Sequence, residues 1–393
     1  MRRMSSRRAG LVTTALVAAI ALTACGGGTG ATSNAEAAPA APIAPAGGPL
    51  DLSGVCPATV VLQQDWQPEA EHGAMYSLVG PDYTVDANTK SVKGSLVTQG
   101  VDTGVDVEVR PGGPNVGFQP VPALMYLDDS IVLGAVNTDE AISSAASQPT
   151  VAVTSQITTS PQILMWDPAT YPGMTTIRDV AAKGASAVTS GDVIPGLLES
   201  KGIIAASQSD TSYDGTPARF VSDPKIMQQG FATAEPYIYE NEIAQWHRPI
   251  AFQRLADDGY SIYPEPLAVR ADKLDALRPC LKKLVPIMQQ AQIDYLKNPG
   301  PTNKLIVDLV NAYQTGWTYS AGVAAFSAKA QVEQGFVTND PASGVFGKFD
   351  PARMQQIVGT FGPILKSKGT ISAVPDPASL YTNEFIDPTI KMG

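Results

Sequence analysis

Short runs of apolar and β-branched residues alternate with longer segments of helical spacing through the chain after Gly48. Apolar runs of about four to eight residues are typical of buried strands, whereas apolar positions three and four residues apart are typical of one helix face. Strands are predicted at 59–64, 105–110, 131–136, 150–157, 162–166 and 185–189. Helices are predicted most clearly at 272–293, 305–313 and 354–361.

This alternation predicts an α/β fold with a largely parallel sheet, because strands separated by helices usually pair in parallel. No internal repeat is visible, and at about 150 residues per domain the 393 residues correspond to two α/β lobes. Hydrophobic residues make up 44% of the chain and charged residues 16%, which is enough apolar material for a large core.

Three loops that follow predicted strands carry polar, aromatic or glycine-rich residues. They are 66–68 (Trp-Gln-Pro), 111–114 (Pro-Gly-Gly-Pro) and 137–140 (Asn-Thr-Asp-Glu). Ligands of open α/β sheets bind outside the carboxyl ends of the strands. The three loops therefore predict a binding site at one edge of the sheet.

The charge balance and the scarcity of metal-binding residues exclude several function classes. Asp and Glu number 37 against 27 for Lys and Arg, and a surface of that sign repels phosphate backbones, so we expect no nucleic-acid partner. Two histidines and three cysteines leave little material for a metal cage or a thiol enzyme. We expect no metal, no cofactor and no catalytic residues.

The N-terminus has the layout of an export signal. Four arginines within the first eight residues precede an uncharged, mostly apolar run at 11–24. This run is shorter than the roughly 20 residues that span a bilayer, so it predicts a signal peptide at 1–24. It ends in Leu-Thr-Ala-Cys at 22–25, which resembles the lipobox of bacterial lipoproteins. The resemblance implies lipidation of Cys25 and a protein exported and lipid-anchored at the outer face of the cell membrane; the alternative is an ordinary secreted protein.

Residues 26–48 support an anchor, because 17 of these 23 residues are Gly, Ala or Pro and cannot form a core. We therefore expect 25–52 to be a lipidated cysteine followed by a flexible tether. With Cys25 bound to lipid, Cys56 and Cys280 remain as an even pair in an oxidising compartment. We predict a disulfide between them; the alternative is two separate buried thiols.

Five sequence blocks, in order, resemble the ABC-transporter substrate-binding proteins that include the nitrate, sulfonate and taurine receptors and the thiamine-pyrimidine-precursor receptors. The blocks are 62–68 continued by His72 and Tyr76, then 107–113, 134–140, 233–237 and 381–385. The resemblance covers most of 57–390. The chain departs from the family's pattern at 82–103, where it is longer, as though a surface excursion were inserted. The stretches 165–172 and 212–220 match no ligand signature of the family.

The resemblance implies the two-lobed periplasmic-binding-protein (type II) fold, with a ligand cleft between lobes that close by hinge motion. Lobe 1 is expected at 53–152 plus 265–393, and lobe 2 at 153–264. The implied partners are a small-molecule solute and the permease and ATPase subunits of an ABC importer. The receptor itself is expected to be a monomer.

The ligand-binding residues that we predict from these blocks are Trp66, His72, Tyr76, Gly113, Thr138, Asp139, Glu140, Asp214 and Glu235. Trp66 offers a flat face for a ring or a cation, and Tyr76 a second wall. His72 either hydrogen-bonds a heteroaromatic nitrogen or pins its loop to a carbonyl. Thr138 is expected to cap a helix whose first turn holds Asp139 and Glu140, and the helix dipole favours those carboxylates even without a ligand.

The charge of the side chains in the candidate loops decides between branches of the family. They supply six carboxylates, at 69, 71, 139, 140, 214 and 235, whereas Arg110 is the only base near any of them. Nitrate or sulfonate needs convergent donors, so the acids favour an amino-substituted ring such as an aminopyrimidine. The alternatives are a receptor for a small anion, an enzyme of pyrimidine-precursor metabolism, and a surface adhesin.

Overall fold

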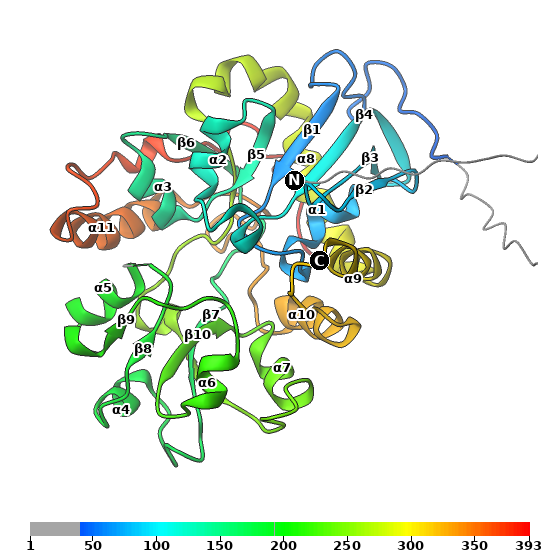
Figure 1. Ribbon diagram of the computed structural model, residues 1–393. Coiled ribbons are helices and arrows are strands. Elements are labelled where there is room, and N and C mark those ends of the chain that lie inside the picture. The colour runs from blue at the N-terminus through cyan, green and yellow to red at the C-terminus, as the bar shows by residue number, and fades with distance from the viewer. Residues whose placement is uncertain (1–39, 192) are drawn as a thin grey trace, which may run out of the picture. The chain divides into compact units, whose positions relative to one another are not determined.

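The apolar runs of the sequence form the strands of two separate β-sheets, one above the other in Figure 1. The structure, a computed structural model, describes residues 40–191 and 193–393, which fall in one compact unit. The predicted signal peptide 1–24 and Cys25 lie outside the described residues. The strands are β1 (Thr59–Gln63), β2 (Thr84–Asp86), β3 (Ser91–Thr98), β4 (Val101–Arg110), β5 (Ile131–Ala135), β6 (Thr150–Thr154), β7 (Gln162–Trp166), β8 (Ala187–Val188), β9 (Ser209–Asp210), β10 (Met227–Phe231), β11 (Ala251–Arg254) and β12 (Leu267–Arg270).

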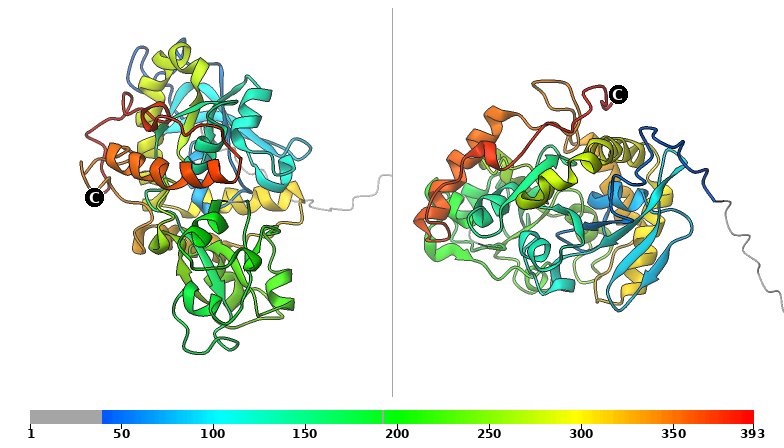
Figure 2. Two further views of the ribbon diagram at one scale, coloured as in Figure 1. Left: turned by 90° about the vertical axis from the view of Figure 1, so that its left-hand side faces the viewer. Right: turned by 90° about the horizontal axis from the view of Figure 1, so that it is seen from above.

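The first sheet has the strand order β2-β3-β4-β1-β5-β12-β6, and we call the part of the chain built on it lobe 1. The second sheet has the order β11-β7-β10-β8-β9 and forms the core of lobe 2. The left-hand view in Figure 2 shows the green segments of lobe 2 gathered below the blue and cyan strands of lobe 1. Because β6 stays in the first sheet to Thr154, lobe 1 extends slightly beyond the predicted boundary at 152.

The sheets are mixed, so the expectation of a largely parallel sheet was wrong. The central strand β1 does run parallel to β4 and β5, with Leu62 opposite Val109 and Leu133. However, β2, β3 and β4 pair antiparallel, and so do β12 with both of its neighbours and β7 with both of its neighbours. The reason lies in the connections, because β12 returns from lobe 2 and enters the sheet in the opposite direction to β5.

The excursion expected at 82–103 extends the first sheet. It forms β2, β3 and the beginning of β4 at the sheet edge. Only Gln99 and Gly100 separate β3 from β4, and both have positive φ, of 51° and 73°. A two-residue turn with positive φ at both positions matches the right-handed twist of a hairpin, so this connection enforces antiparallel pairing.

The predicted helices 272–293, 305–313 and 354–361 correspond to α8, α9 and α11, each longer than its apolar pattern suggested. None of the helices within 40–191 and 193–393 combines the length and apolar character needed to span a bilayer. The helices are α1 (Gly73–Ser77), α2 (Val121–Leu127), α3 (Thr138–Ser144), α4 (Ile177–Ala181), α5 (Val193–Ser200), α6 (Ala218–Ser222), α7 (Glu235–Asn241), α8 (Leu274–Lys297), α9 (Gly300–Tyr313), α10 (Ala321–Glu333) and α11 (Pro351–Ser367), with short 3₁₀ turns η1 (Ala70–His72), η2 (Gly113–Val116), η3 (Ala206–Gln208), η4 (Leu255–Asp258), η5 (Ala271–Lys273) and η6 (Pro377–Ser379).

The last part of the predicted tether packs on lobe 1. The prediction of a flexible tether as far as residue 52 was therefore wrong for this part. The backbone N–H of Ala44 donates to the carbonyl of Asp102, and Leu52 is fully buried in the core of the lobe. Lys283 on α8 donates its Nζ to the carbonyl oxygens of Gly48 and Asp51. These contacts satisfy backbone groups that a free tether would leave to water.

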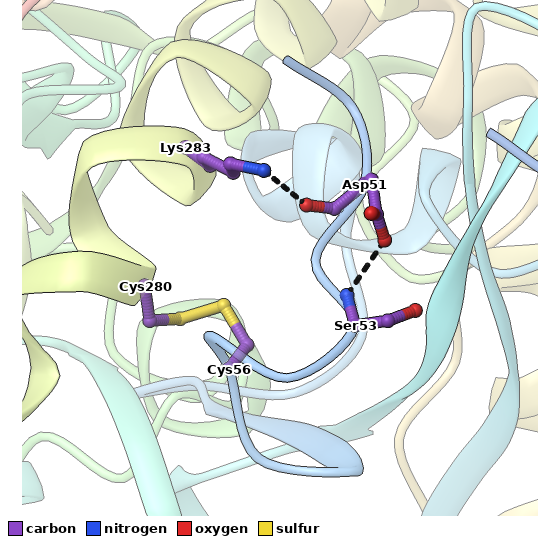
Figure 3. The surroundings of a disulfide bond; sticks show 5 residues. All are labelled: Asp51, Ser53, Cys56, Cys280 and Lys283. Atoms are coloured by element: carbon purple, nitrogen blue, oxygen red, sulfur yellow. Dashed lines mark hydrogen bonds between the residues drawn. A yellow bond between two sulfur atoms is a disulfide. The ribbon is translucent and has the colours of Figure 1, made fainter. Parts of the chain in front are cut away.

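The disulfide in the structure joins Cys56, in the loop before β1, to Cys280 on α8 (Figure 3). It ties together segments that lie 224 residues apart in the sequence. Lys283 of the same helix also bonds the carbonyl of Asp51. One face of α8 therefore holds the segment before β1 against lobe 1 (Figure 3). Constraining so long a loop removes a large conformational entropy from the unfolded chain.

We predict that the double variant Cys56→Ser/Cys280→Ser has a free energy of unfolding lower by about 2–5 kcal/mol. Denaturation by guanidinium, followed by circular dichroism, measures the loss. Dithiothreitol should lower the transition midpoint of the natural chain and leave that of the double variant unchanged. A natural chain that shows the same alkylated mass with and without prior reduction would contradict the bond.

Candidate functional site

A cavity of about 590 Å³, here called the outer cavity, opens between lobe 1 and lobe 2. A smaller and more enclosed space of about 190 Å³, the inner cavity, adjoins it and shares several of its lining residues. Lobe 1 and lobe 2 both contribute side chains to each cavity. The shared lining residues are Asp65, Trp66, Phe118, Asn137, Gln162, Ser190, Tyr213 and Gln229.

The three loops singled out in the sequence meet at the outer cavity. Asp65 and Trp66 follow β1, Gly113 follows β4, and the segment 137–140 follows β5. These loops lie together because β1 runs parallel between β4 and β5, so that the three carboxyl ends share one edge of the sheet.

Trp66 lines both cavities and is held by neighbours on several sides. The centre of its ring lies 6.0 Å from that of Phe118 and 6.4 Å from that of Trp317, the latter perpendicular. A Cβ on Gly113 would lie 2.7 Å from its Cε3 atom, and one on Gly215 would lie 2.6 Å from its Cζ2 atom. Both glycines also have positive φ. Gly113, which was predicted to bind ligand, thus has a second role, because the absence of a side chain leaves space for the indole of Trp66.

Contacts across the cleft connect the two lobes around this ring. Trp66 belongs to lobe 1 and Gly215 to lobe 2, so their contact crosses the cleft. Deeper in the cleft, the hydroxyl of Thr233 in lobe 2 donates to the carboxylate of Glu71 in lobe 1. These contacts make the position of lobe 2 depend on the side chains of lobe 1 that line the cavities.

The helix α3 begins as predicted, but its cap differs. Asn137 is the N-cap, and Thr138 is already inside the first turn, so the prediction of Thr138 as the cap was wrong. The Thr138 hydroxyl donates to the carbonyl of Tyr263 and accepts from its N–H, at 2.7 and 3.1 Å. It lines neither cavity, and it contacts the segment that returns from lobe 2 before β12.

Asp139 and Glu140 both line the outer cavity, in different environments. The Oδ2 atom of Asp139 accepts a 2.7 Å hydrogen bond from the Tyr260 hydroxyl, yet burial raises the pKa of Asp139. The Oε2 atom of Glu140 is buried and has no hydrogen-bond partner. Burial, with the nearby carboxylates of Asp65 and Asp139, raises the pKa of Glu140 to about 8.

The two aromatic candidates beyond Trp66 lie inside lobe 1 and line neither cavity. Tyr76 is buried in the core and its hydroxyl donates to the Oε1 atom of Gln64, so a role as a second wall of the site was wrong. His72 is also buried, and its Nε2 atom lies 3.0 Å from Asp65 Oδ1 and 3.2 Å from Glu265 Oε2. Two roles were predicted for His72, a bond to the ligand or a bond that fixes its own loop. The contacts with Asp65 and Glu265 resemble the second role, with carboxylates in place of a carbonyl.

The charge state of His72 follows from these neighbours. Burial alone would lower its pKa, but the carboxylates of Glu265 and Asp65 outweigh burial and raise the pKa of His72 well above its usual value. Burial likewise raises the pKa of Glu265, with the charge of Asp65 adding to the effect. One imidazole thus stands between two carboxylates from distant parts of the chain.

Of the two candidates in lobe 2, one reaches the site. Glu235 lines the inner cavity, and its Oε2 atom accepts a 2.6 Å hydrogen bond from the N–H of Phe231. Burial raises the pKa of Glu235 to about 7. Asp214 is exposed and lines neither cavity; its Oδ1 atom accepts from the N–H and hydroxyl of Thr216. The placement of Asp214 does not support a contact with ligand.

Sequence reasoning missed several residues of the site. Asp65 stands next to Trp66 after β1 and could have been found from that position alone. Trp317 lines the inner cavity and lies against Trp66. Glu265 has no local signal, because it reaches the site only where the chain returns from lobe 2 toward β12.

Carboxyl groups dominate the charged and titratable side chains of the described lining. Five carboxylates face the inner cavity, and neither cavity has a Lys, Arg or His among its described lining residues. Arg110, the one base that the sequence placed nearby, is held by Glu108 and Asp128 outside both cavities. The arrangement suits ligands that carry N–H donors or positive charge. The five carboxylates belong to Asp65, Glu69, Glu71, Glu235 and Glu265.

Comparison with known proteins shows the fold. No protein-family model and no curated protein matches the sequence. Among solved structures, a protein from Bordetella bronchiseptica RB50 is similar at a TM-score of 0.52 and 14% identity, over 84% of this chain and 96% of that one. The periplasmic aliphatic sulphonate binding protein SsuA from Escherichia coli is similar at a TM-score of 0.52 and 11% identity, over 82% and 92%. The predicted fold class, α/β with the two lobes of a periplasmic binding protein, is confirmed.

We predict that Glu140→Gln makes the unliganded protein less sensitive to alkaline pH. The folded-state pKa of Glu140 is about 8, against 4.5 for the free side chain. Its contribution to stability is therefore present below pH 4.5 and is lost as the pH rises through 8. The melting temperature of the variant should exceed that of the natural chain by about 2 °C or more at pH 8.5, with a smaller difference at pH 5.

Thermal melts across this pH range provide the measurement, and Asp214→Asn, an exposed acid outside the cavities, is the control. The melting temperature of the Asp214 variant should equal that of the natural chain at every pH. Parallel curves for Glu140→Gln and the natural chain would contradict the burial of this carboxylate.

Proposed function

We propose that the protein is an extracytoplasmic solute receptor of an ABC importer, and that its solute is a small, nitrogen-containing ring of the aminopyrimidine type. The observation that carries the proposal is a cleft between two lobes whose buried carboxylate oxygens lack partners. Glu140 Oε2 in the outer cavity and Glu71 Oε2 in the inner cavity are both in this state. An unsatisfied buried acceptor is costly, and a ligand N–H removes the cost by donating to it.

The dimensions and the apolar surfaces of the cleft support a ring-shaped solute. The outer cavity, at about 590 Å³, falls within the usual range for small-molecule sites, about 300–1,000 Å³. Trp66 and Phe118 supply aromatic surface to both cavities, next to the carboxylates. Aromatic surface beside hydrogen-bond acceptors fits a flat ring that carries amino groups.

Selectivity against anions follows from the same residues. A sulfonate or nitrate site requires convergent cationic or N–H donors, and the described lining has no Lys, Arg or His. Those carboxyl groups that are ionised would repel an anion at close range in a site of low dielectric. A receptor for a small anion, the alternative weighed from the sequence, is therefore disfavoured by the charge of the cleft.

Transport in this proposal requires the lobes to separate and close around the solute. Trp66 contacts Gly215 across the cleft, so opening frees part of the indole surface and closing covers the bound ring. The solute leaves unchanged when the closed receptor docks on its permease. Cys25 at the end of the predicted signal peptide would hold the receptor at the outer face of the membrane by its lipid.

The experiment is a thermal-shift screen of the purified chain, treated with EDTA, against aminopyrimidines, other amino heterocycles, taurine, alkanesulfonates and nitrate. We predict that a ring with N–H donors raises the melting temperature. Tight binding of taurine or nitrate with no response to amino heterocycles would overturn the proposal.

We further predict that Trp66→Ala abolishes the shift caused by the solute, because its ring supplies aromatic surface to both cavities. The control is Tyr83→Ala, which removes an aromatic ring that lines neither cavity and is 39% exposed. Isothermal titration should give a loss of at least tenfold in affinity for the Trp66 variant alone. Equal affinities in the two variants would remove Trp66 from the site.

A further inference from the structure

Asp65, His72 and Glu265 bring three potential metal-ligand atoms together at the wall of the inner cavity. Each offers one atom, and the three atoms lie within 4.8 Å of one another. His72 Nε2 is 3.0 Å from Asp65 Oδ1 and 3.2 Å from Glu265 Oε2. The residues come from the loop after β1, from η1 and from the segment before β12, so the fold assembles the group from distant parts of the chain.

An ordinary ion pair leaves this group incompletely satisfied. The Nε2 atom of an imidazole carries one proton, and it forms its hydrogen bond with Asp65 Oδ1. Glu265 Oε2 is left buried without a hydrogen-bond partner, although it lies 3.2 Å from the same nitrogen. Glu265 is 4% exposed, so water from the bulk does not compensate. A cation between the three atoms would bond all of them at once.

We propose that Asp65, His72 and Glu265 bind a divalent transition-metal ion of the kind that accepts mixed nitrogen and oxygen ligands, such as Zn²⁺. Bonds of about 2.1 Å from one ion set neighbouring ligand atoms roughly 3.0–3.4 Å apart, which matches the 3.0 and 3.2 Å separations from His72 Nε2. One imidazole with two carboxylates is a donor set that Zn²⁺, Mn²⁺ and Fe²⁺ accept.

A fourth residue, Asn137, holds Asp65 by its carboxylate and Glu265 by its backbone. The Asn137 Nδ2 donates to Asp65 Oδ2 at 3.0 Å, and the Asn137 Oδ1 accepts from the backbone N–H of Glu265 at 3.1 Å. These bonds leave Asp65 Oδ1 and Glu265 Oε2 directed at the imidazole. Residues that fix metal-bound carboxylates in this way are typical of protein metal sites.

The surroundings fit a cation with an open coordination position. Glu69, Glu71 and Glu235 add further carboxylates to the inner cavity, with no Lys, Arg or His among its described lining residues. Asp65 and Glu265 themselves line that cavity, so one side of the ion would face the space where water or a donor atom of the solute binds. The chain has two histidines, which argued against a metal cage in the sequence, but a carboxylate-rich site requires only one.

The test uses the purified chain stripped with EDTA and titrated with Zn²⁺ alone, with no solute present. Calorimetry and elemental analysis should give one ion per chain, and Co²⁺ should give a visible absorption band that Zn²⁺ removes. His72→Gln and Glu265→Gln should each weaken Zn²⁺ binding at least tenfold. Asn137→Ala should weaken it about 10–100-fold by releasing the Asp65 carboxylate and the backbone of Glu265.

The control is Asp214→Asn, which removes an exposed carboxylate outside both cavities and should change Zn²⁺ affinity less than twofold. Glu265→Gln keeps the shape of the side chain, so it tests the site even where His72→Gln does not fold, and circular dichroism reports the folding of each variant. Absence of stoichiometric Zn²⁺ binding in the natural chain would overturn the proposal, leaving an ion pair. So would unchanged affinity in Glu265→Gln, or an equal loss in Asp214→Asn. The solute screen in EDTA is independent of this titration, so either proposal can fail alone.

Discussion

Carboxyl groups crowded into a cleft are the constraint on which the rest of the structure depends. Carboxylates buried in protein must be protonated, hydrogen-bonded or paired, because an isolated charge in a low dielectric is very costly. The protein uses several of these solutions: Tyr260 donates to Asp139, the Phe231 N–H donates to Glu235, and His72 stands between Asp65 and Glu265. Glu140 keeps a raised pKa and an unpartnered oxygen. A ligand with N–H donors or positive charge would bond the carboxylate oxygens that have no partner in the chain. Both the solute proposal and the metal proposal follow from this.

The devices that stabilise the fold are concentrated in lobe 1, which also provides most of the polar groups of the cleft. The disulfide from Cys56 to Cys280, the chain docked by Lys283 and the added hairpin at 82–103 all belong to this lobe. Lobe 2 contributes fewer carboxylates and contacts lobe 1 through Gly215 and Thr233. One lobe that holds most of the polar groups and a second lobe that covers them is an arrangement that suits the proposed receptor function, in which the lobes open and close.

Much of the fold could be predicted from local sequence, because the strands at 59–64, 131–136 and 162–166 are buried runs whose ends differ little from the observed ones. The convergence of three loops could be predicted as well, since parallel neighbours place their carboxyl ends together. What could not be predicted depends on long-range connections. The antiparallel entry of β12 and the arrival of Glu265 beside His72 both follow from the return of the chain from lobe 2, which no local pattern encodes.

The errors at single residues share one physical cause, which is that neighbours compete for the same side chain. Thr138 has the chemistry of an N-cap, but Asn137 takes that position and Thr138 bonds the backbone of Tyr263. Tyr76 has the chemistry of a binding-site wall, but Gln64 offers its hydroxyl a buried acceptor and the ring fills the core. Gly113 is also determined by a neighbour, because a side chain at this position would overlap the ring of Trp66. The identity of a residue thus limits what it can bind, and its partners in the fold decide which of those options it uses.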